Sequence, residues 1–187
     1  MLKLHYSEKR TELLFMKKLI ALFILAAFAL SPLEVSAAEE FDLTVPCGLS
    51  EEELAAGLRD ELIAFAPEFI AAEQKYGVNA VFLAAVAALE SGWGKSCFRP
   101  NNIFGWNGKD FESKAECIDF VASKIAEHYL SEGGKYYHGK TVSGVNICYN
   151  GSDFWERKVT EIMAMITRGS KAAQCVSDVP AEVVFIG

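Results

Sequence analysis

The feature that most constrains this chain is an uncharged, apolar segment that runs from Asn79 to Leu89 and ends at Glu90. Its large side chains are interleaved with alanines, so every side of a helix built from it is apolar. A helix that is apolar all round has to be buried all round. The sequence therefore predicts a central buried helix from about residue 79 to residue 90, closed by the Gly-rich segment 91–94.

Further helices are predicted around this segment from the spacing of apolar residues and from helix-end signals. Capping boxes at Ser50–Glu53 and Ser113–Glu116 each mark a helix start. The expected helices run from Ser50 to Phe65, from about Pro67 to Gly77, from Ser113 to about Tyr129, and from about Ser152 to Gly169. Residues 97–111 are predicted to form a loop or a small hairpin, and a second loop opens at Gly133.

Residues 1–38 have the pattern of a secretory signal peptide. Lys17 and Lys18 precede an apolar run from Leu19 to Leu30, and small residues follow at 35–38. The alternative is an uncleaved anchor, although the run is shorter than the ~20 residues that span a bilayer. We expect a linker over residues 39–50, one folded domain over 51–170 and a tail over 171–187.

The charge of the chain beyond the leader excludes some partners. The leader holds five Lys and Arg and three Asp and Glu, so 13 basic and 22 acidic residues remain, a net charge of −9. Contacts to phosphates need Lys and Arg, so nucleic acid is not an expected partner. Membrane contact is expected only if the leader is not cleaved.

All five cysteines lie beyond the leader, where an exported chain forms disulfides. We hypothesise the pairs Cys47–Cys175 and Cys97–Cys148, and we expect Cys117 to be free because it lies in a predicted helix. The sequence has no CxxC pair and no Cys/His cluster at zinc spacing. Neither a metal nor another cofactor is therefore predicted.

Glu90 is the main candidate for chemistry. A carboxylate at the end of a buried apolar helix is expected to lose hydration, which favours its neutral form. A carboxylic acid that keeps its proton near neutral pH is what protonation of a glycosidic oxygen requires. A Glu that caps or pairs with a neighbouring loop fits this pattern equally well.

Two motifs follow the buried helix, ESGWGKS at residues 90–96 and NNIFGW at residues 101–106. Together they closely resemble the glucosaminidase family of peptidoglycan hydrolases, which includes proteins described as mannosyl-glycoprotein endo-β-N-acetylglucosaminidase-like. Segments 136–141 and 149–159 are similar to the family as well. The resemblance covers roughly residues 53–168.

The resemblance implies a lysozyme-like fold, α+β but mostly α, with a cleft between the helical core and loop or short hairpin segments. It implies an endo-β-N-acetylglucosaminidase that acts on the peptidoglycan glycan strand. From the leader we expect a secreted or cell-envelope protein, and we expect it to be a monomer. By the family's motifs, Glu90 is the general acid and Tyr149 lies near the cleaved bond. Asn102, Phe104 and Gly105 match the loop that shapes the floor of the cleft.

The aromatic residues divide by their surroundings. Trp106 and Tyr137 lie in polar, Gly-rich loops, where a role in binding sugar is more natural than burial in a core. Trp155 fits the apolar stripe of the last helix, so we expect it in the core.

The chain departs from the family at the hairpin that carries a second carboxylate in many relatives, because this hairpin is shortened here. Asp110 and Glu112 are candidates for a base, whereas Glu116 is expected to cap its helix. Without a second carboxylate, the substrate's own acetamido group is an alternative nucleophile, which Tyr149 would orient.

Three other functions stay open from the sequence. A lytic transglycosylase also uses a single Glu in a lysozyme-like fold, and it forms a 1,6-anhydro product without a water-activating base. A degenerate domain would bind glycan without cleaving it. A Cys–His hydrolase is disfavoured, because cysteines of an exported domain are more often bonded to each other.

Overall fold

The computed structural model describes residues 41–177, with side chains through Lys171. This part of the chain is mostly helical, as predicted, and it contains no strand between residues 41 and 177. The predicted leader and most of the predicted tail lie outside the described residues. The α-helices are α2 (Glu51–Gly57), α3 (Ala66–Tyr76), α4 (Ala80–Ser91), α5 (Lys114–Ile125), α6 (Val142–Tyr149) and α7 (Asp153–Ser177); the shorter turns are the 3₁₀ helices η1 (Asp60–Phe65) and η2 (Trp106–Gly108) and the π-helical η3 (Ala126–Leu130).

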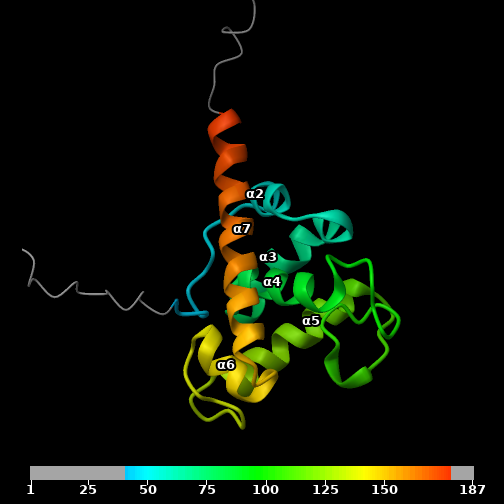
Figure 1. The fold of residues 1–187 in the computed structure, drawn as a ribbon, viewed down its shortest axis with the longest axis vertical. Coiled ribbons are helices and arrows are strands. Elements are labelled where there is room, and N and C mark those ends of the chain that lie inside the picture. The colour runs from blue at the N-terminus through cyan, green and yellow to red at the C-terminus, as the bar shows by residue number, and fades with distance from the viewer. Residues whose placement is uncertain (1–40, 178–187) are drawn as a thin grey trace, which may run out of the picture. The chain divides into compact units, whose positions relative to one another are not determined.

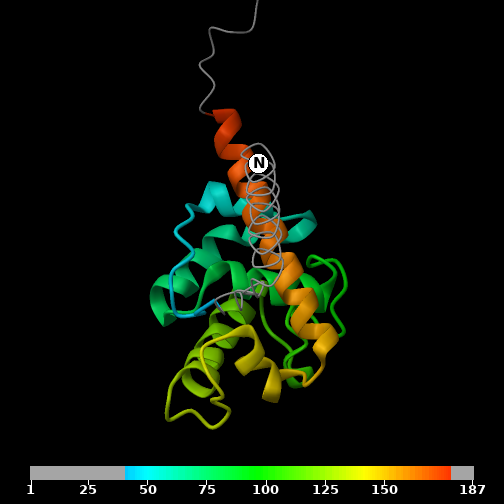
Figure 2. The same ribbon diagram turned by 60° about the vertical axis from the view of Figure 1, so that its left-hand side comes forward.

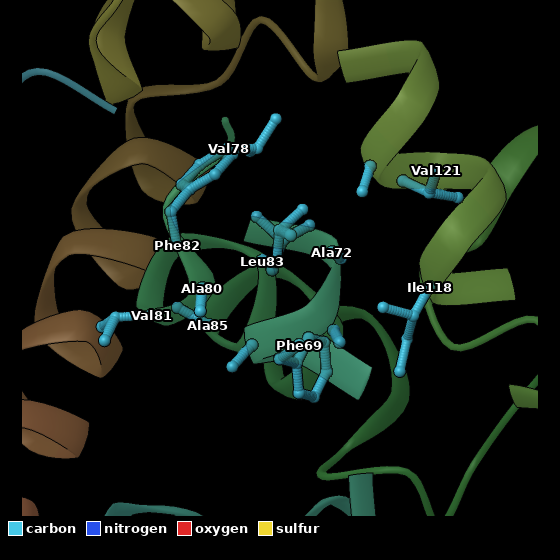
Figure 3. Packing of buried hydrophobic residues seen from close by; sticks show 14 of the residues in the cluster. Phe69, Ala72, Val78, Ala80, Val81, Phe82, Leu83, Ala85, Ile118 and Val121 are labelled. Atoms are coloured by element: carbon cyan, nitrogen blue, oxygen red, sulfur yellow. The ribbon is translucent and has the colours of Figure 1, made fainter. Parts of the chain in front are cut away.

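Helix α4 is the buried centre that the sequence predicts. Residues 80–88 are all buried, the side chain of Asn79 accepts from the Phe82 N–H (3.0 Å), and Gly92 ends the helix in the left-handed conformation. Helix α4 packs against α3 and α7, and α3 packs against α5. Figure 3 shows Phe69 of α3 together with the α4 side chains, with Ile118 of α5 to one side.

Helix α7 is the longest element among residues 41–177 and continues beyond the predicted end at Gly169. It runs beside α2, α4 and α6 (Figures 1 and 2). A Cβ at Gly169 would lie 3.0 Å from the Cα of Gly57, and a Cβ at Gly57 would collide with the backbone of Ile166. Both glycines therefore let α2 and α7 approach closely, so the prediction that Gly169 stops the helix was wrong.

The single helix predicted from Ser50 to Phe65 is two pieces. The capping box at Ser50 and Glu53 is present, but α2 ends at Gly57 because Leu58 adopts an extended conformation, and η1 follows. Leu54, Leu58 and Leu62 are nevertheless all buried. The apolar spacing was thus a correct guide to burial and a wrong guide to helix length.

The predicted linker is part of the fold where the structure describes it. Residues 41–50, here named the N-terminal strap, place Leu43 fully inside the core. The Leu43 N–H donates to the Lys140 carbonyl (2.7 Å), and its carbonyl accepts from the Asn79 N–H (2.8 Å). The buried Glu73 carboxylate accepts from the Cys47 N–H (2.8 Å). The strap therefore joins the start of α4 to the loop before α6.

Helix α6 was not predicted from the sequence. Thr141 caps it by accepting from the Gly144 N–H (3.0 Å), and Val142 and Val145 are buried. An eight-residue helix with an internal glycine shows little periodicity, which explains why it was missed. Its importance is positional, because it ends at Tyr149.

Candidate active site

Glu90 occupies the last turn of α4, where the chain is held firmly. The buried Ser91 donates its hydroxyl to the Ala87 carbonyl (2.5 Å) and accepts from the Gly94 N–H (2.8 Å). These bonds and the left-handed Gly92 fix the end of the helix. The backbone that carries Glu90 is therefore anchored to the core of the domain.

The side chain of Glu90 is exposed, although the helix before it is buried. The predicted loss of hydration is therefore wrong for the free protein, because the apolar residues surround the helix and not its terminal carboxyl group. Its Oε1 accepts a hydrogen bond from the indole Nε1 of Trp155 (2.8 Å). Its Oε2 lies beside Gly105, where a Cβ would be 3.7 Å away.

The buried Asn102 side chain holds the conformation of the loop after Cys97 by hydrogen bonds to its backbone. The Asn102 amide donates to the carbonyls of Trp106 (3.2 Å) and Lys109 (2.8 Å), and its Oδ1 accepts from the Trp106 N–H (2.8 Å). Phe104 is buried too, whereas Gly105 is exposed and Trp106 is half-buried. Of the four predicted loop residues, Asn102 and Phe104 support the surface that Gly105 and Trp106 present.

Tyr149 lies at the end of α6 and is joined to the same loop. Its hydroxyl donates to the Phe104 carbonyl (3.3 Å), and its ring packs against those of Trp106 (6.1 Å between centroids) and Trp155 (5.1 Å). Burial raises the pKa of the Tyr149 hydroxyl well above its usual value, and the nearby Glu90 charge raises it further. The phenol therefore stays neutral within the electrostatic reach of Glu90.

Tyr136, rather than the predicted Tyr137, is connected to this group of aromatic rings. The Tyr136 ring packs on Tyr129 (5.1 Å), which in turn packs on Tyr149 (6.0 Å). Tyr137 is half-buried, and its N–H closes a turn with the Gly134 carbonyl (3.2 Å). Within the described residues its ring takes no part in these contacts, so its role in binding stays a prediction.

The candidate bases, Asp110 and Glu112, lie on the exposed segment that precedes α5. Neither carboxylate is hydrogen-bonded to Glu90 or Tyr149 in the part of the chain that the structure describes. One half of the expected capping box is present, because the Glu116 N–H donates to the Ser113 hydroxyl (3.0 Å). The Glu116 carboxylate accepts from the Glu112 N–H (2.7 Å) and not from that of Ser113. Among the described residues, Glu90 is the carboxyl group that is hydrogen-bonded to an aromatic side chain of the candidate site, and a role of Asp110 or Glu112 as the base stays a prediction.

Trp155 is the site residue that the sequence reasoning missed. It is buried on the inner face of α7 as predicted, but its indole N–H reaches the Glu90 carboxyl. A buried indole N–H needs an acceptor, and this requirement was the available signal. The spacing of apolar residues does not reveal which acceptor it finds, because Glu90 lies on another helix.

The cysteines do not form the expected pair at the site. Cys97, Cys117 and Cys148 are all free thiols, so the predicted Cys97–Cys148 disulfide is absent. Cys117 is buried in α5 as expected, and burial raises its pKa to about 11. Cys47 is also free, and its proposed partner Cys175 has a side chain outside the described residues. The raised thiol pKa values of Cys47, Cys97 and Cys117 disfavour a thiolate nucleophile.

Two negative findings apply to the described residues. No group of three or more His, Cys, Asp or Glu side chains is arranged to hold a metal ion there. Nor do the described residues include a helix that is both long enough and apolar enough to cross a membrane.

A helical domain that presents one anchored, exposed carboxyl group beside half-buried aromatic rings has features expected of a glycoside hydrolase. The profile of the family described as mannosyl-glycoprotein endo-β-N-acetylglucosaminidase matches residues 66–168. The chain belongs to this glucosaminidase family. The predicted resemblance is thereby confirmed, and the match spans α3 through most of α7.

Two proteins of Streptococcus pneumoniae, from strains TIGR4 and R6, are similar to this chain. Both are provisionally assigned as endo-beta-N-acetylglucosaminidases, and both are 32% identical over 109 residues. The matched region is 52% of this chain but only 16% and 15% of the two relatives. The matched part of the chain thus spans about one sixth of the length of these larger proteins.

Proposed function

We propose that this protein is an exported peptidoglycan hydrolase that cleaves the glycan strand at N-acetylglucosamine linkages, with Glu90 as the general acid. The observation that supports this most strongly is the position of the Glu90 carboxyl. It projects from an anchored helix end, with Oε2 beside Gly105 and Oε1 bonded to Trp155, and its negative charge helps to raise the pKa of the Tyr149 hydroxyl. Family membership supplies the substrate class.

The exposure of Glu90 bears on how the acid keeps its proton. In the free protein the carboxyl group is hydrated, so a bound glycan has to exclude that water. A sugar ring packed on Trp106 would cover Oε2 and lower the local dielectric, which favours the protonated form. In this proposal the lysozyme-like cleft is the surface between the end of α4 and the loop carrying Trp106.

Completion of the reaction requires a nucleophile at the anomeric carbon. Water activated by Asp110 or Glu112 and the acetamido group of the substrate are the two routes considered. Tyr149 favours the second route, because its neutral hydroxyl lies near Glu90 and retains an oxygen lone pair that accepts from the acetamido N–H.

The test is release of reducing ends from purified cell walls. The wild-type protein should release them, and Glu90→Gln should remove the activity while keeping the fold, since Gln preserves size but cannot donate an acidic proton. Glu161→Gln is the matched control, because Glu161 lies on the exposed side of α7 and pairs with Lys158. Full activity of the Glu90→Gln protein would refute the assignment.

A lytic transglycosylase is the second candidate. It is favoured by one observation: the segment from Trp106 to Ser113 contains only the short η2 and no strand, so the hairpin that carries a second carboxylate in many relatives is not formed there. That reaction ends in a 1,6-anhydro sugar and needs no water-activating base. Mass spectrometry of the released fragments separates the two, because hydrolysis adds one water to each cleaved bond and transglycosylation adds none.

A further inference from the structure

The hydrogen bond between Trp155 and Glu90 joins two helices that lie far apart in the sequence. The indole Nε1 of Trp155, near the start of α7, donates to Oε1 of Glu90 at 2.8 Å. Only 3% of the Trp155 surface is exposed, and its ring packs on Tyr149 at 5.1 Å with 34° between the planes. Tyr149 is itself bonded to the Phe104 carbonyl. The indole is thus fixed in place before any substrate arrives.

The two oxygens of the Glu90 carboxyl therefore have different surroundings. Oε1 accepts the indole N–H, whereas Oε2 lies toward the exposed Gly105, which has no side chain to cover it. A proton on Oε1 would leave that oxygen a poorer acceptor for the indole, so the proton is more stable on Oε2. The open side of the carboxyl group is then also its acidic side.

We propose that Trp155 is a positioning residue that assigns the two oxygens of Glu90 to different tasks, with Oε1 held by the indole and Oε2 carrying the proton that is donated. This inference rests on the proposed function of Glu90 as the acid. It extends that function by naming the donating oxygen and the group that selects it.

The chemical step follows directly. The bond from the anomeric carbon to the glycosidic oxygen breaks, its electron pair goes to that oxygen, and the proton on Oε2 transfers to the same oxygen. Glu90 becomes a carboxylate, and the positive charge on the sugar is taken up by the ring oxygen until water or the acetamido group bonds to the carbon. The indole hydrogen bond strengthens as the carboxylate forms, because hydrogen bonds to ionised acceptors are stronger. Trp155 therefore stabilises the transition state more than the ground state.

A purely structural role for Trp155 is the competing explanation, since a buried indole needs some acceptor in any case. The first experiment distinguishes a structural role of Trp155 from a positioning role without measuring enzymatic activity. The protein has three tryptophans, so a ¹⁵N-labelled sample gives three indole N–H signals. The Trp155 signal, assigned by its loss in Trp155→Phe, should follow the titration of Glu90, and this dependence should vanish in Glu90→Gln. Tyr149 does not interfere, because its pKa is raised far above the acidic range.

The second experiment is the kinetics of Trp155→Phe, which keeps an aromatic ring but removes the N–H. We expect kcat to fall by about ten- to a hundredfold, the range for a hydrogen bond to a charged group, with little change in KM. The alkaline limb of the pH–rate profile should move to higher pH, because the carboxylate form has lost a donor. Trp93→Phe is the matched control, since its ring lies against Arg59 (5.3 Å) and not against Glu90; its pH profile should match the wild type.

Three outcomes would overturn the inference: a Trp155 indole signal that does not sense Glu90, wild-type kcat in Trp155→Phe, or a lower kcat with an unmoved alkaline limb. If Trp155→Phe does not fold, the Trp155 signal is assigned as the one that remains in both Trp93→Phe and Trp106→Phe, and its pH dependence in the wild type and in Glu90→Gln decides. Failure of the proposed function looks different, because Glu90→Gln would then remain active. An inactive Glu90→Gln with an unaffected Trp155→Phe refutes only the role of Trp155.

Discussion

Gly105 is the position where the geometry of the site makes its sharpest prediction. Its φ is +63°, and a Cβ placed there would lie 3.7 Å from Oε2 of Glu90. The substitution Gly105→Ala therefore has two effects, backbone strain and a methyl group against the donating oxygen. The first lowers stability and the second blocks the substrate.

A second glycine of the same loop isolates the two effects. Gly108 has the same φ of +63°, but a Cβ there would have no neighbour within 4 Å. Both substitutions to alanine should lower the free energy of unfolding by about 1–2 kcal/mol, the cost of a left-handed conformation for a residue with a Cβ. Chemical denaturation monitored by tryptophan fluorescence measures this cost for each variant.

Activity should separate the two variants. A methyl group at 3.7 Å is in ordinary van der Waals contact with Oε2, so it occupies the space that the glycosidic oxygen needs. Displacing a reacting oxygen by about 1 Å costs about a hundredfold in rate, so we expect Gly105→Ala to lose at least tenfold in kcat/KM on soluble glycan fragments. Gly108→Ala should stay within about threefold, corresponding to roughly 0.6 kcal/mol. Equal losses in both variants would refute the reasoning, because strain alone would then explain them.

Three further predictions follow from the same structure. Leu43→Ala should lower the free energy of unfolding by about 2–5 kcal/mol, because it empties a fully buried site in the N-terminal strap; calorimetry measures the loss, and an unchanged melting temperature would mean that the strap is dispensable. Asn102→Ala should cost about 1–3 kcal/mol and raise KM, because it removes the group that bonds to the Trp106 backbone; unfolding and kinetic measurements on one preparation check both effects. Cys117 should react with a disulfide reagent near pH 8 far more slowly than the exposed Cys148, because a pKa raised to about 11 leaves little thiolate until the pH approaches that value; equal rates in the folded protein would contradict its burial.

Much of the fold follows from local signals. The alanine-rich α4, its start near Asn79 and the glycines that end α3 and α4 were all predicted at about the right residues. These signals act within a few residues of each other along the chain. These features can therefore be predicted from the sequence without knowledge of the tertiary structure.

The errors arise where tertiary contacts decide the outcome. Gly169 resembles a helix stop, but it faces Gly57 across a close contact that only the fold creates. The strap resembles a linker because Leu43 is the one fully buried apolar residue among residues 41–50, and one residue shows no periodicity.

The candidate site could be predicted only in part, because some of its contacts also depend on the tertiary structure. The carboxyl group and its loop were found from adjoining motifs, whereas the hydration of Glu90 was misjudged from the burial of its helix. The bond from Trp155 spans 65 residues, and no sequence spacing predicts such a contact.

The most direct test of the central claim compares substrates that differ in their need for an acid. Cleavage of the wall glycan needs protonation of the glycosidic oxygen, which leaves as a sugar hydroxyl. A dinitrophenyl glycoside of N-acetylglucosamine oligomers has a leaving group that departs without a proton. We predict that Glu90→Gln loses about 10²–10⁴-fold on the glycan, the usual contribution of a general acid, and far less on the dinitrophenyl substrate. Equal losses on both substrates, or undiminished cleavage of the glycan, would contradict the role of Glu90 as the proton donor.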